Sequence, residues 1–256
     1  MTFQYFNQFF KSVVTLISVL LLAACSQSNN VSSDSNLSSN IDPYERTNRR
    51  IFKFNTGLDT HLVRPVAKAY KKVTPDVVEN GVNNFFNNLK DVGSTINNLL
   101  QFKLGPALMD SERVLFNSTI GLAGVFDVAT ALDIERYEED FGQTLAHWGV
   151  ESGPYVMLPF LGPSTVRDAT AKLTIDSLTN PANYHEQSLA LFALDKIDQR
   201  ADFFSDEEAF KDISDDSYAA LRDLWLQRRS VLVNDGKVSE EEQSNLIDEL
   251  ESLDDE

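Results

Sequence analysis

The chain has 256 residues, of which 42% are hydrophobic and 24% are charged, and its formal net charge is −17. This length suits one domain of ordinary size or two small ones. Because so acidic a chain repels a polyphosphate, we expect no nucleic acid among its partners. The only cysteine, Cys25, cannot form a disulfide within the chain, so the fold must rest on packing.

Residues 1–24 have the pattern of a secretory signal peptide. One positive side chain, Lys11, is followed by an apolar run over residues 13–22 and by two alanines before Cys25. The apolar run is too short to span a bilayer. The small-small-Cys ending resembles the lipobox of bacterial lipoproteins, which implies that Cys25 becomes the lipidated first residue of the mature chain. A cleaved signal followed by a chance cysteine is the alternative.

The residues after Cys25 predict a lipidated, flexible tether over residues 25–41, because positions 26–41 hold seven serines and four asparagines. Ser26 follows the cysteine in place of an aspartate, and this implies an address on the periplasmic side of the outer membrane of a Gram-negative bacterium. We expect one folded domain over residues 42–234. An acidic tail over residues 235–256 could end in an amphipathic helix or stay disordered.

Charge is unevenly spread over the folded region. Residues 42–72 carry a net charge of +5, whereas residues 195–256 carry −13. One interpretation is that the two regions attract each other. The other places the basic region near anionic headgroups, since arginine forms strong bonds to phosphate. The candidates for that contact are Arg46, Arg49, Arg50, Lys53 and Arg64.

The clearest helix is predicted after Thr74 and Pro75, where Thr74 can cap the helix and Pro75 suits its first position. Apolar residues from Val78 to Leu99 or Leu100 fall on one stripe at helical spacing. A face in bulk water would mix charged residues, so a row of amides predicts a polar surface that is neither dry core nor free solvent. A soluble helix that happens to use asparagine is the alternative. The row opposite the stripe is Asn83, Asn84, Asn87, Asn88 and Asn98.

Charges are sparse over residues 92–132 and 141–166, and the second stretch contains the sequence GPYVMLPFLGP at 153–163. Its glycines and prolines exclude a regular helix. Such an apolar segment must be buried in protein or membrane. Farther on, Ser205 and Glu208 predict a capping box for another helix.

The sequence has no phosphate-binding loop, no zinc-protease motif and no Cys/His metal cluster. We therefore expect no enzyme activity, no metal and no cofactor. The three histidines, His61, His147 and His185, lie far apart. A Ser-His-Asp lipase stays open as an alternative, because such triads assemble from distant positions.

Short motifs in a fixed order carry a resemblance to a known family. In chain order they are Asp42-Pro43 with Arg46-Thr47-Asn48, Phe54-Asn55, Val63-Arg64-Pro65-Val66-Ala67, Asn84-Phe85 with Asn88-Leu89, Asn117-Ser118-Thr119-Ile120-Gly121, Phe126-Asp127-Val128-Ala129, Phe141-Gly142-Gln143-Thr144-Leu145, Trp148-Gly149-Val150, Gly153-Pro154-Tyr155 with Leu158-Pro159, and Arg167-Asp168. Together with the lipobox, they make the region from Asp42 to about Arg229 similar to the MlaA family of outer-membrane lipoproteins, also called VacJ.

The resemblance implies a mainly α fold: a single ring-shaped helical domain that lies in one membrane leaflet and has a central amphipathic channel. It also implies partners, namely phospholipids, a trimeric outer-membrane porin and a soluble periplasmic lipid carrier. The implied function is removal of mislocalised phospholipid from the outer leaflet through a passive channel, for retrograde transport that maintains lipid asymmetry. A porin-associated structural lipoprotein without transport is the first alternative, and a lipid hydrolase is the second.

The resemblance and the residue patterns together give two sets of candidate residues. Candidates for the channel and the headgroup contacts are Phe54, Asn55, Arg64, Asn84, Asn87, Asn88 and Asn117. Candidates for a flexible hairpin that gates the channel are Trp148, Gly149, Gly153, Pro154, Tyr155, Leu158 and Pro159. Glu151 stands where family members often have a glycine, which puts the mobility of the hairpin in question.

Overall fold

The computed structural model of the protein describes residues 41–205 and 216–236. The predicted signal peptide, the lipidated Cys25, nearly all of the tether, Glu208 of the predicted capping box and the acidic tail from residue 237 lie outside the described residues.

Helices make up most of the described chain. The first half contains α3 (Glu45–Leu58), the π-helical turn η1 (Asp59–Val63), α4 (Arg64–Val73), α5 (Asp76–Leu100), α6 (Leu104–Thr119) and α7 (Val128–Ala131). The second half contains α8 (Phe141–His147), β1 (Tyr155–Leu158), β2 (Gly162–Thr165), α9 (Val166–Ala171), the π-helical turn η2 (Lys172–Asp176), α10 (Ser177–Thr179), the 3₁₀ turn η3 (Pro181–Tyr184), α11 (Ser188–Asp202), the 3₁₀ turn η4 (Phe203–Ser205) and α13 (Ser217–Val233). The prediction of a mainly α fold is confirmed.

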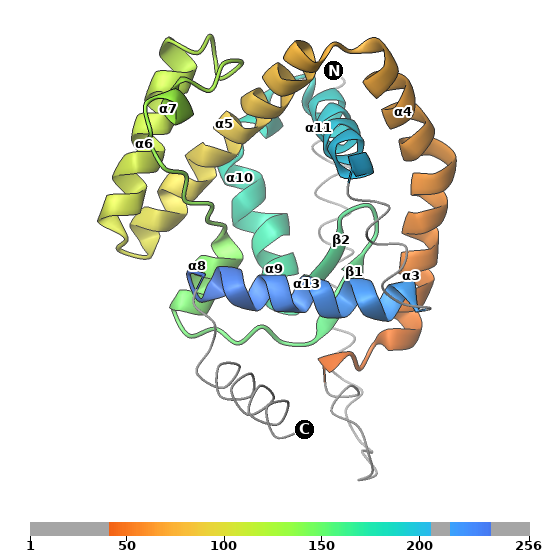
Figure 1. Cartoon of the computed structure of the whole chain (residues 1–256). Helices are drawn as coiled ribbons and strands as arrows, with labels where there is room; N and C mark the ends of the chain where they lie inside the picture. Colours follow the sequence, from red (N-terminus) through yellow and green to blue (C-terminus); the bar gives the residue numbers. More distant parts are fainter. Residues whose placement is uncertain (1–40, 206–215, 237–256) are drawn as a thin grey trace, which may run out of the picture.

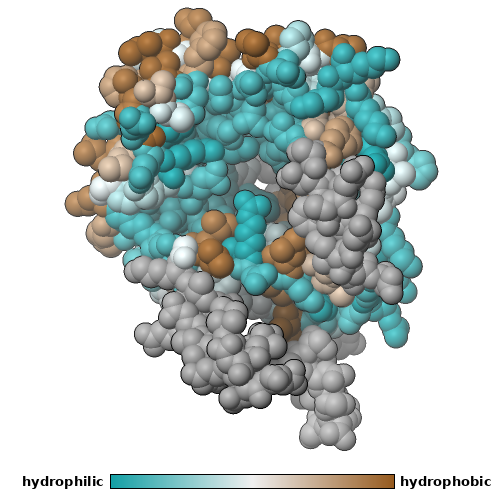
Figure 2. All heavy atoms as spheres, viewed as in Figure 1, coloured by the Kyte–Doolittle hydropathy of each residue, from teal (hydrophilic) through white to brown (hydrophobic). Residues whose placement is uncertain are grey.

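The helices are arranged in a ring (Figure 1). Helices α3 and α4, joined by η1, form one side, and α5 leads from the end of α4 to α8 and α9. Helix α13 crosses back to α3, α11 packs in the angle between α4 and α5, and α6 with α7 flanks α5 on the outside. Figure 2 shows this face hollowed near the centre of the ring, with hydrophilic residues along the edge of the hollow.

Contacts between α3 and α13 close the ring. The rings of Phe52 and Tyr218 meet edge to face, with centroids 5.6 Å apart. The Tyr218 hydroxyl donates to Asp42 Oδ2 at 2.5 Å, and Arg49 Nη2 lies 2.6 Å from Asp216 Oδ2. The pair of Arg49 and Asp216 joins the basic region to the acidic one, so the predicted attraction between these regions is confirmed at this point.

The junction between α4 and α5 differs by one residue from the prediction. Thr74 has an extended backbone (φ −95°, ψ 120°) and follows the end of α4, while Pro75 occupies the N-cap position of α5 and not its first helical position. The ring of a proline disfavours helical geometry in the residue before it. Thr74 is therefore drawn out of both helices, and it forms no side-chain cap.

Helix α5 turns its polar side inward. Its buried residues are mostly polar or charged: Glu79, Asn88, Asp91, Ser94, Asn97 and Asn98, together with Gly81 and Phe86. Two residues of its apolar stripe, Val78 and Leu99, are 52% and 50% exposed. The prediction of a face that is neither core nor solvent is wrong for Asn98, because Asp110 of α6 and the Tyr137 carbonyl bind its fully buried side chain.

The other described residues show the same distribution, in which polar side chains are buried and apolar side chains are exposed. Eleven hydrophobic residues are buried there, seven of them alanines, against twenty buried polar or charged residues. Thirty large hydrophobic residues are exposed. In Figure 2 the hydrophobic colour gathers on the outer rim, over α6 and α7. The exterior of the ring thus suits apolar surroundings, and the interior does not.

The glycine- and proline-rich segment forms a β-hairpin, in agreement with the prediction that it is not a helix. Strand β1 pairs antiparallel with β2 in a register that sets Tyr155 opposite Thr165. Tyr155 and Met157 are buried against Tyr218 of α13, with Trp225 packed beside them. Of the two surroundings predicted for this apolar segment, protein or membrane, Tyr155 and Met157 lie in protein.

Candidate functional site

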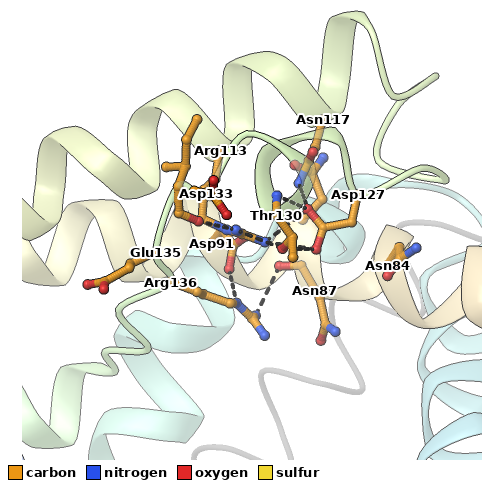
Figure 3. A pocket seen from close by; sticks show the side chains of 12 residues that line it. Asn84, Asn87, Asp91, Arg113, Asn117, Asp127, Thr130, Asp133, Glu135 and Arg136 are labelled. Atoms are coloured by element: carbon orange, nitrogen blue, oxygen red, sulfur yellow. Dashed lines mark hydrogen bonds and ion pairs between the residues drawn. The ribbon is translucent and has the colours of Figure 1, made fainter.

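A cavity of about 480 Å³ lies between α5, α6, α7 and the segment that follows α7 (Figure 3). Four of the predicted channel residues line it: Asn84, Asn87 and Asn88 from α5, and Asn117 from α6. The remaining lining residues are Asp91, Arg113, Asp127, Thr130, Asp133, Ile134, Glu135 and Arg136. The structure thus brings together the predicted residues on α5 and α6 in a cavity lined almost wholly by polar and charged residues.

Arg113 organises one wall of this cavity. It is 4% exposed, and its Nη2 donates to both carboxylate oxygens of Asp127 at 3.1 Å. Its Nη1 donates to the Thr130 hydroxyl at 3.2 Å and to the Ile134 carbonyl at 2.6 Å. Burial would raise the pKa of Asp127, but hydrogen bonds from Thr130 and Asn117 and the charge of Arg113 outweigh it and lower the pKa. Asp127 therefore stays ionised and holds the wall together.

Asp91 lies between two arginines (Figure 3). Its Oδ1 accepts a bond from Arg136 Nε at 2.5 Å, and its Oδ2 lies 3.6 Å from Arg113 Nε. Asp91 is 1% exposed, and burial raises its pKa in spite of both guanidinium groups. Among the described residues, none donates a hydrogen bond to Asp91 Oδ2 or to Asn88 Oδ1. The cavity thus offers two buried acceptors to a guest that carries hydrogen-bond donors.

A further polar contact between α5 and α6 adjoins the cavity. Asp110 accepts bonds from Asn98 Nδ2 at 2.9 Å and from the Tyr137 backbone N–H at 3.0 Å. Burial of Asp110 raises its pKa to about 6, although both bonds act in the opposite direction. Sequence reasoning missed these acids. Their signal is the helical spacing of polar residues, at 91, 94 and 98 on α5 and at 110, 113 and 117 on α6.

Two smaller cavities, of about 280 and 180 Å³, adjoin each other inside the ring. Both are lined by Asp140, Lys172, Asp176 and Leu232. Arg136 lines the 280 Å³ cavity and the 480 Å³ cavity. Arg136 therefore joins the walls of these two cavities along α5.

Arg229 of α13 ties the wall of the 180 Å³ cavity to α8 and α9. It donates to both oxygens of Asp140 at 2.6 and 2.7 Å and to Asp168 Oδ2 at 2.8 Å. Arg167 donates to the other oxygen of Asp168 at 2.8 Å. A Cβ at Gly142 would lie 2.5 Å from both Arg229 Nη2 and Asp168 Oδ1, so only glycine fits beside this cluster.

The predicted channel residues Phe54, Asn55 and Arg64 do not line the 480 Å³ cavity. Arg64 begins α4, on another side of the ring. Phe54 meets Phe160 edge to face, with centroids 5.4 Å apart. The prediction grouped these residues with the asparagines of α5, and the fold separates them.

Two asparagines of α3 fasten the hairpin. Asn48 donates to the Tyr155 carbonyl at 3.1 Å and accepts from the Met157 N–H at 2.9 Å. Asn55 donates to the Leu158 carbonyl at 2.9 Å and accepts from the Phe160 N–H at 3.0 Å. Each asparagine side chain thus donates one bond to the backbone of the hairpin and accepts one from it, as a residue of a neighbouring strand would. Sequence reasoning missed this role of Asn48, although the spacing of seven residues places both asparagines on one face of α3.

The other candidates for the gate lie in the segment between α8 and β1 or in the turn after β1. Trp148 ends α8 and donates from Nε1 to the Leu100 carbonyl at 3.2 Å. Gly149 and Gly153 have φ values of +85° and +66°, which few other residues adopt. Pro154 precedes β1, and Pro159 lies in the turn after Leu158. The role of these residues as a gate stays a prediction.

Within residues 41–205 and 216–236, no three carboxylate, histidine or cysteine side chains gather as a metal site would require. His61 lies in η1, His147 in α8 and His185 just after η3. His61 Nδ1 lies 2.8 Å from the Gly57 carbonyl oxygen of its own helical segment. Over the same ranges, no helix combines the length and the hydropathy of a membrane span.

Comparison with known proteins agrees with this geometry. The model of the MlaA lipoprotein family matches residues 40–232. The chain belongs to this family. A solved structure, reported as the structural basis for maintenance of bacterial outer membrane lipid asymmetry, is similar with a TM-score of 0.67 and 32% identity, over 75% of this chain and 98% of the other.

Named relatives are similar over most of their length. The intermembrane phospholipid transport system lipoprotein MlaA of Shigella flexneri is 33% identical over 224 residues, which cover 84% of this chain and 88% of that protein. The Escherichia coli K12 protein of the same name is 32% identical, with the same coverage. An uncharacterized protein of Rickettsia typhi is 34% identical over 75% of this chain and 78% of its own.

Proposed function

We propose that this protein is an outer-membrane lipoprotein that removes mislocalised phospholipid from the outer leaflet through a passive channel in its ring. It hands the lipid to a soluble periplasmic carrier for retrograde transport, and in this way it maintains lipid asymmetry. Lipid on Cys25 anchors it to the periplasmic side, beside a trimeric porin. The family and the names of the Shigella and Escherichia relatives support this function.

The inverted distribution of polarity is the observation that carries the proposal. On α6, Leu104, Leu108 and Leu115 form one outward stripe and are 68%, 61% and 59% exposed, while Asp110 and Arg113 of the same helix are buried. In water, this exposed apolar area is unfavourable by about 25 cal/mol per Å². In the acyl region of a leaflet the same surface is stabilised, so the ring suits a place within one leaflet.

The polar cavities supply the second requirement of a lipid channel. A charged headgroup that leaves water needs hydrogen-bonding partners, since an unpaired buried polar group costs several kcal/mol. The adjoining cavities along α5 offer asparagine amides, guanidinium groups and carboxylates. Acyl chains remain outside such a path, against the apolar exterior.

The hairpin over residues 148–163 completes the proposed channel as its gate. Because Asn48 and Asn55 bond its backbone and α13 buries Tyr155 and Met157, the hairpin can open only together with α3 or by breaking those bonds. Gly149 and Gly153 supply the hinge at its start.

The function is tested in cells that lack this protein. Wild-type protein is expected to restore a low outer-leaflet phospholipid content and resistance to detergent. The Cys25→Ala variant is expected to accumulate as an uncleaved precursor and to fail, because acylation precedes cleavage at a lipobox. Normal outer-leaflet phospholipid without the protein would contradict transport and favour the porin-associated structural role. Correctly cut Cys25→Ala protein in the outer membrane would contradict the lipid anchor.

A further inference from the structure

Lys172 is a cation that lines two cavities and pairs with no residue that the structure describes. It begins η2, which lies between α9 and α10 in Figure 1, and it lines both the 180 and the 280 Å³ cavities. Its ammonium group forms no hydrogen bond or ion pair with any residue that the structure describes. Its side chain is accessible, yet the surrounding protein desolvates the ammonium group and lowers its pKa.

The carboxylates nearest in the wall are already engaged. Both oxygens of Asp140 accept bonds from Arg229. Asp168 accepts one bond from Arg229 and one from Arg167. Two acids thus balance two arginines, and neither acid is left to neutralise Lys172.

The other charged side chains of this wall are two cations and one acid. Arg228 lines the 180 Å³ cavity and, like Lys172, pairs with no described residue. Asp176, four residues after Lys172, is the remaining carboxyl group of this wall. Its Oδ1 accepts a bond from the Phe141 N–H at 2.9 Å, and burial raises its pKa to about 6. Two cations that pair with no described residue therefore face one carboxyl group with a raised pKa. The excess of positive charge in this wall favours an anionic ligand.

From this placement we infer that Lys172 and Arg228 bind the phosphate group of a phospholipid as it passes through the ring. The inference rests on the proposed function and assigns it a headgroup contact. An ammonium and a guanidinium group both donate charge-assisted bonds to phosphate oxygens. Trp225 and Leu232 line the same wall, and this apolar surface beside the two cations suits a lipid better than a free ion.

Isothermal titration calorimetry of the full-length protein in dodecyl maltoside tests the inference. The probes are dihexanoyl-phosphatidylglycerol, dihexanoylglycerol, which has the same chains and no phosphate, and sodium phosphate. We expect the phospholipid to bind at least about tenfold more tightly than either other probe, as the loss of one charge-assisted bond implies.

Substitutions at the site sharpen the test. Lys172→Gln is expected to weaken phospholipid binding by at least about tenfold, Lys172→Arg to keep it within a few-fold, and Lys68→Gln, on the exposed side of α4, to leave it unchanged. Equal binding of phospholipid by wild type and Lys172→Gln would overturn the inference, and so would equal binding of dihexanoylglycerol. If sodium phosphate binds as tightly as the phospholipid, the site binds free phosphate and the inference of a lipid ligand is wrong. None of these outcomes contradicts the proposed function. That function is contradicted only if the wild-type protein does not restore lipid asymmetry in cells.

Discussion

At the scale of single residues, the interior of this protein is held by charges that neutralise one another. Arg113 contributes to two such pairs, with Asp127 and Asp91. We expect Arg113→Met to destabilise the protein by about 3–5 kcal/mol, because it removes the guanidinium partner of Asp127 and leaves the buried Asp91 with Arg136 alone. Chemical unfolding of the detergent-purified protein, followed by circular dichroism, measures the change.

The matched control is Arg50→Met on the exposed face of α3, which removes the same charge from water. It is expected to change the free energy of unfolding by less than about 0.5 kcal/mol. An equally small effect of Arg113→Met would show that the 480 Å³ cavity does not depend on this pair.

Asp110 gives the protein a dependence on pH. Burial raises its pKa from 3.8 to about 6, so the folded protein binds this proton more tightly than the unfolded chain does. The free energy of unfolding that protonated Asp110 contributes is fully present below pH 3.8 and is lost as the pH rises through about 6. Asp110→Asn cannot ionise, and we expect it to be more stable than wild type at pH 7.5 by up to roughly 3 kcal/mol.

Thermal unfolding from pH 4 to pH 8 measures this difference. The gap between Asp110→Asn and wild type is expected to widen as the pH rises. Asp133→Asn, an exposed acid beside the same cavity, provides the control and should follow the wild-type curve. A constant gap at every pH would mean that Asp110 does not titrate in this range.

At the scale of elements, the hairpin depends on α3. Asn55 makes two bonds to the backbone of the hairpin, each worth about 1 kcal/mol. We expect Asn55→Ala to speed hydrogen exchange of the amides over residues 155–165 by about tenfold or more. Exchange measured by mass spectrometry on the full-length protein tests this.

Thr56→Ala, on the exposed side of α3 beside it, is the control and should leave the exchange unchanged. Unaltered protection in Asn55→Ala would show that the core contacts of Tyr155 and Met157 hold the hairpin without the amide bonds.

The positions of the helices and of the non-helical segment were easier to predict from the sequence than the face that each helix buries. The helix after Pro75 and the non-helical segment over residues 153–163 follow from periodicity and from glycine and proline. Periodicity alone does not say which face of a helix turns inward. On α5 the buried face is the polar one, which no rule for a water-soluble protein predicts.

The candidate site was predictable only where its residues share a helix or two adjacent helices. Asn84, Asn87 and Asn88 lie on one face of α5, and Asn117 joins them because α6 folds back against α5. The bonds between Arg229 and Asp140 join positions 89 residues apart. Such pairs arise from the closed ring, and a single sequence contains no local trace of them.

At the scale of the whole molecule, the apolar exterior should set where the protein resides. We expect a triple substitution of Leu104, Leu108 and Leu115 by glutamine to reduce binding to phosphatidylethanolamine and phosphatidylglycerol vesicles, since it removes an exposed apolar stripe. Vesicle flotation of protein expressed without the signal peptide measures binding. Circular dichroism confirms that the helices remain.

Substitution of the same three leucines by methionine keeps the stripe apolar and is the control. It should float with the vesicles as wild type does. Equal flotation of the glutamine variant would place the membrane contact elsewhere on the ring.

The predominance of alanine among the buried apolar residues bears on the thermodynamics of unfolding. Exposure of apolar area raises the heat capacity, and exposure of polar area lowers it. The described interior holds seven alanines and only four larger hydrophobic residues, against twenty polar or charged ones. The heat capacity change of unfolding per residue should therefore fall below the usual ~12–15 cal/mol/K. The free energy of unfolding then varies with temperature along a shallow curve, so a protein built in this way loses little stability on cooling.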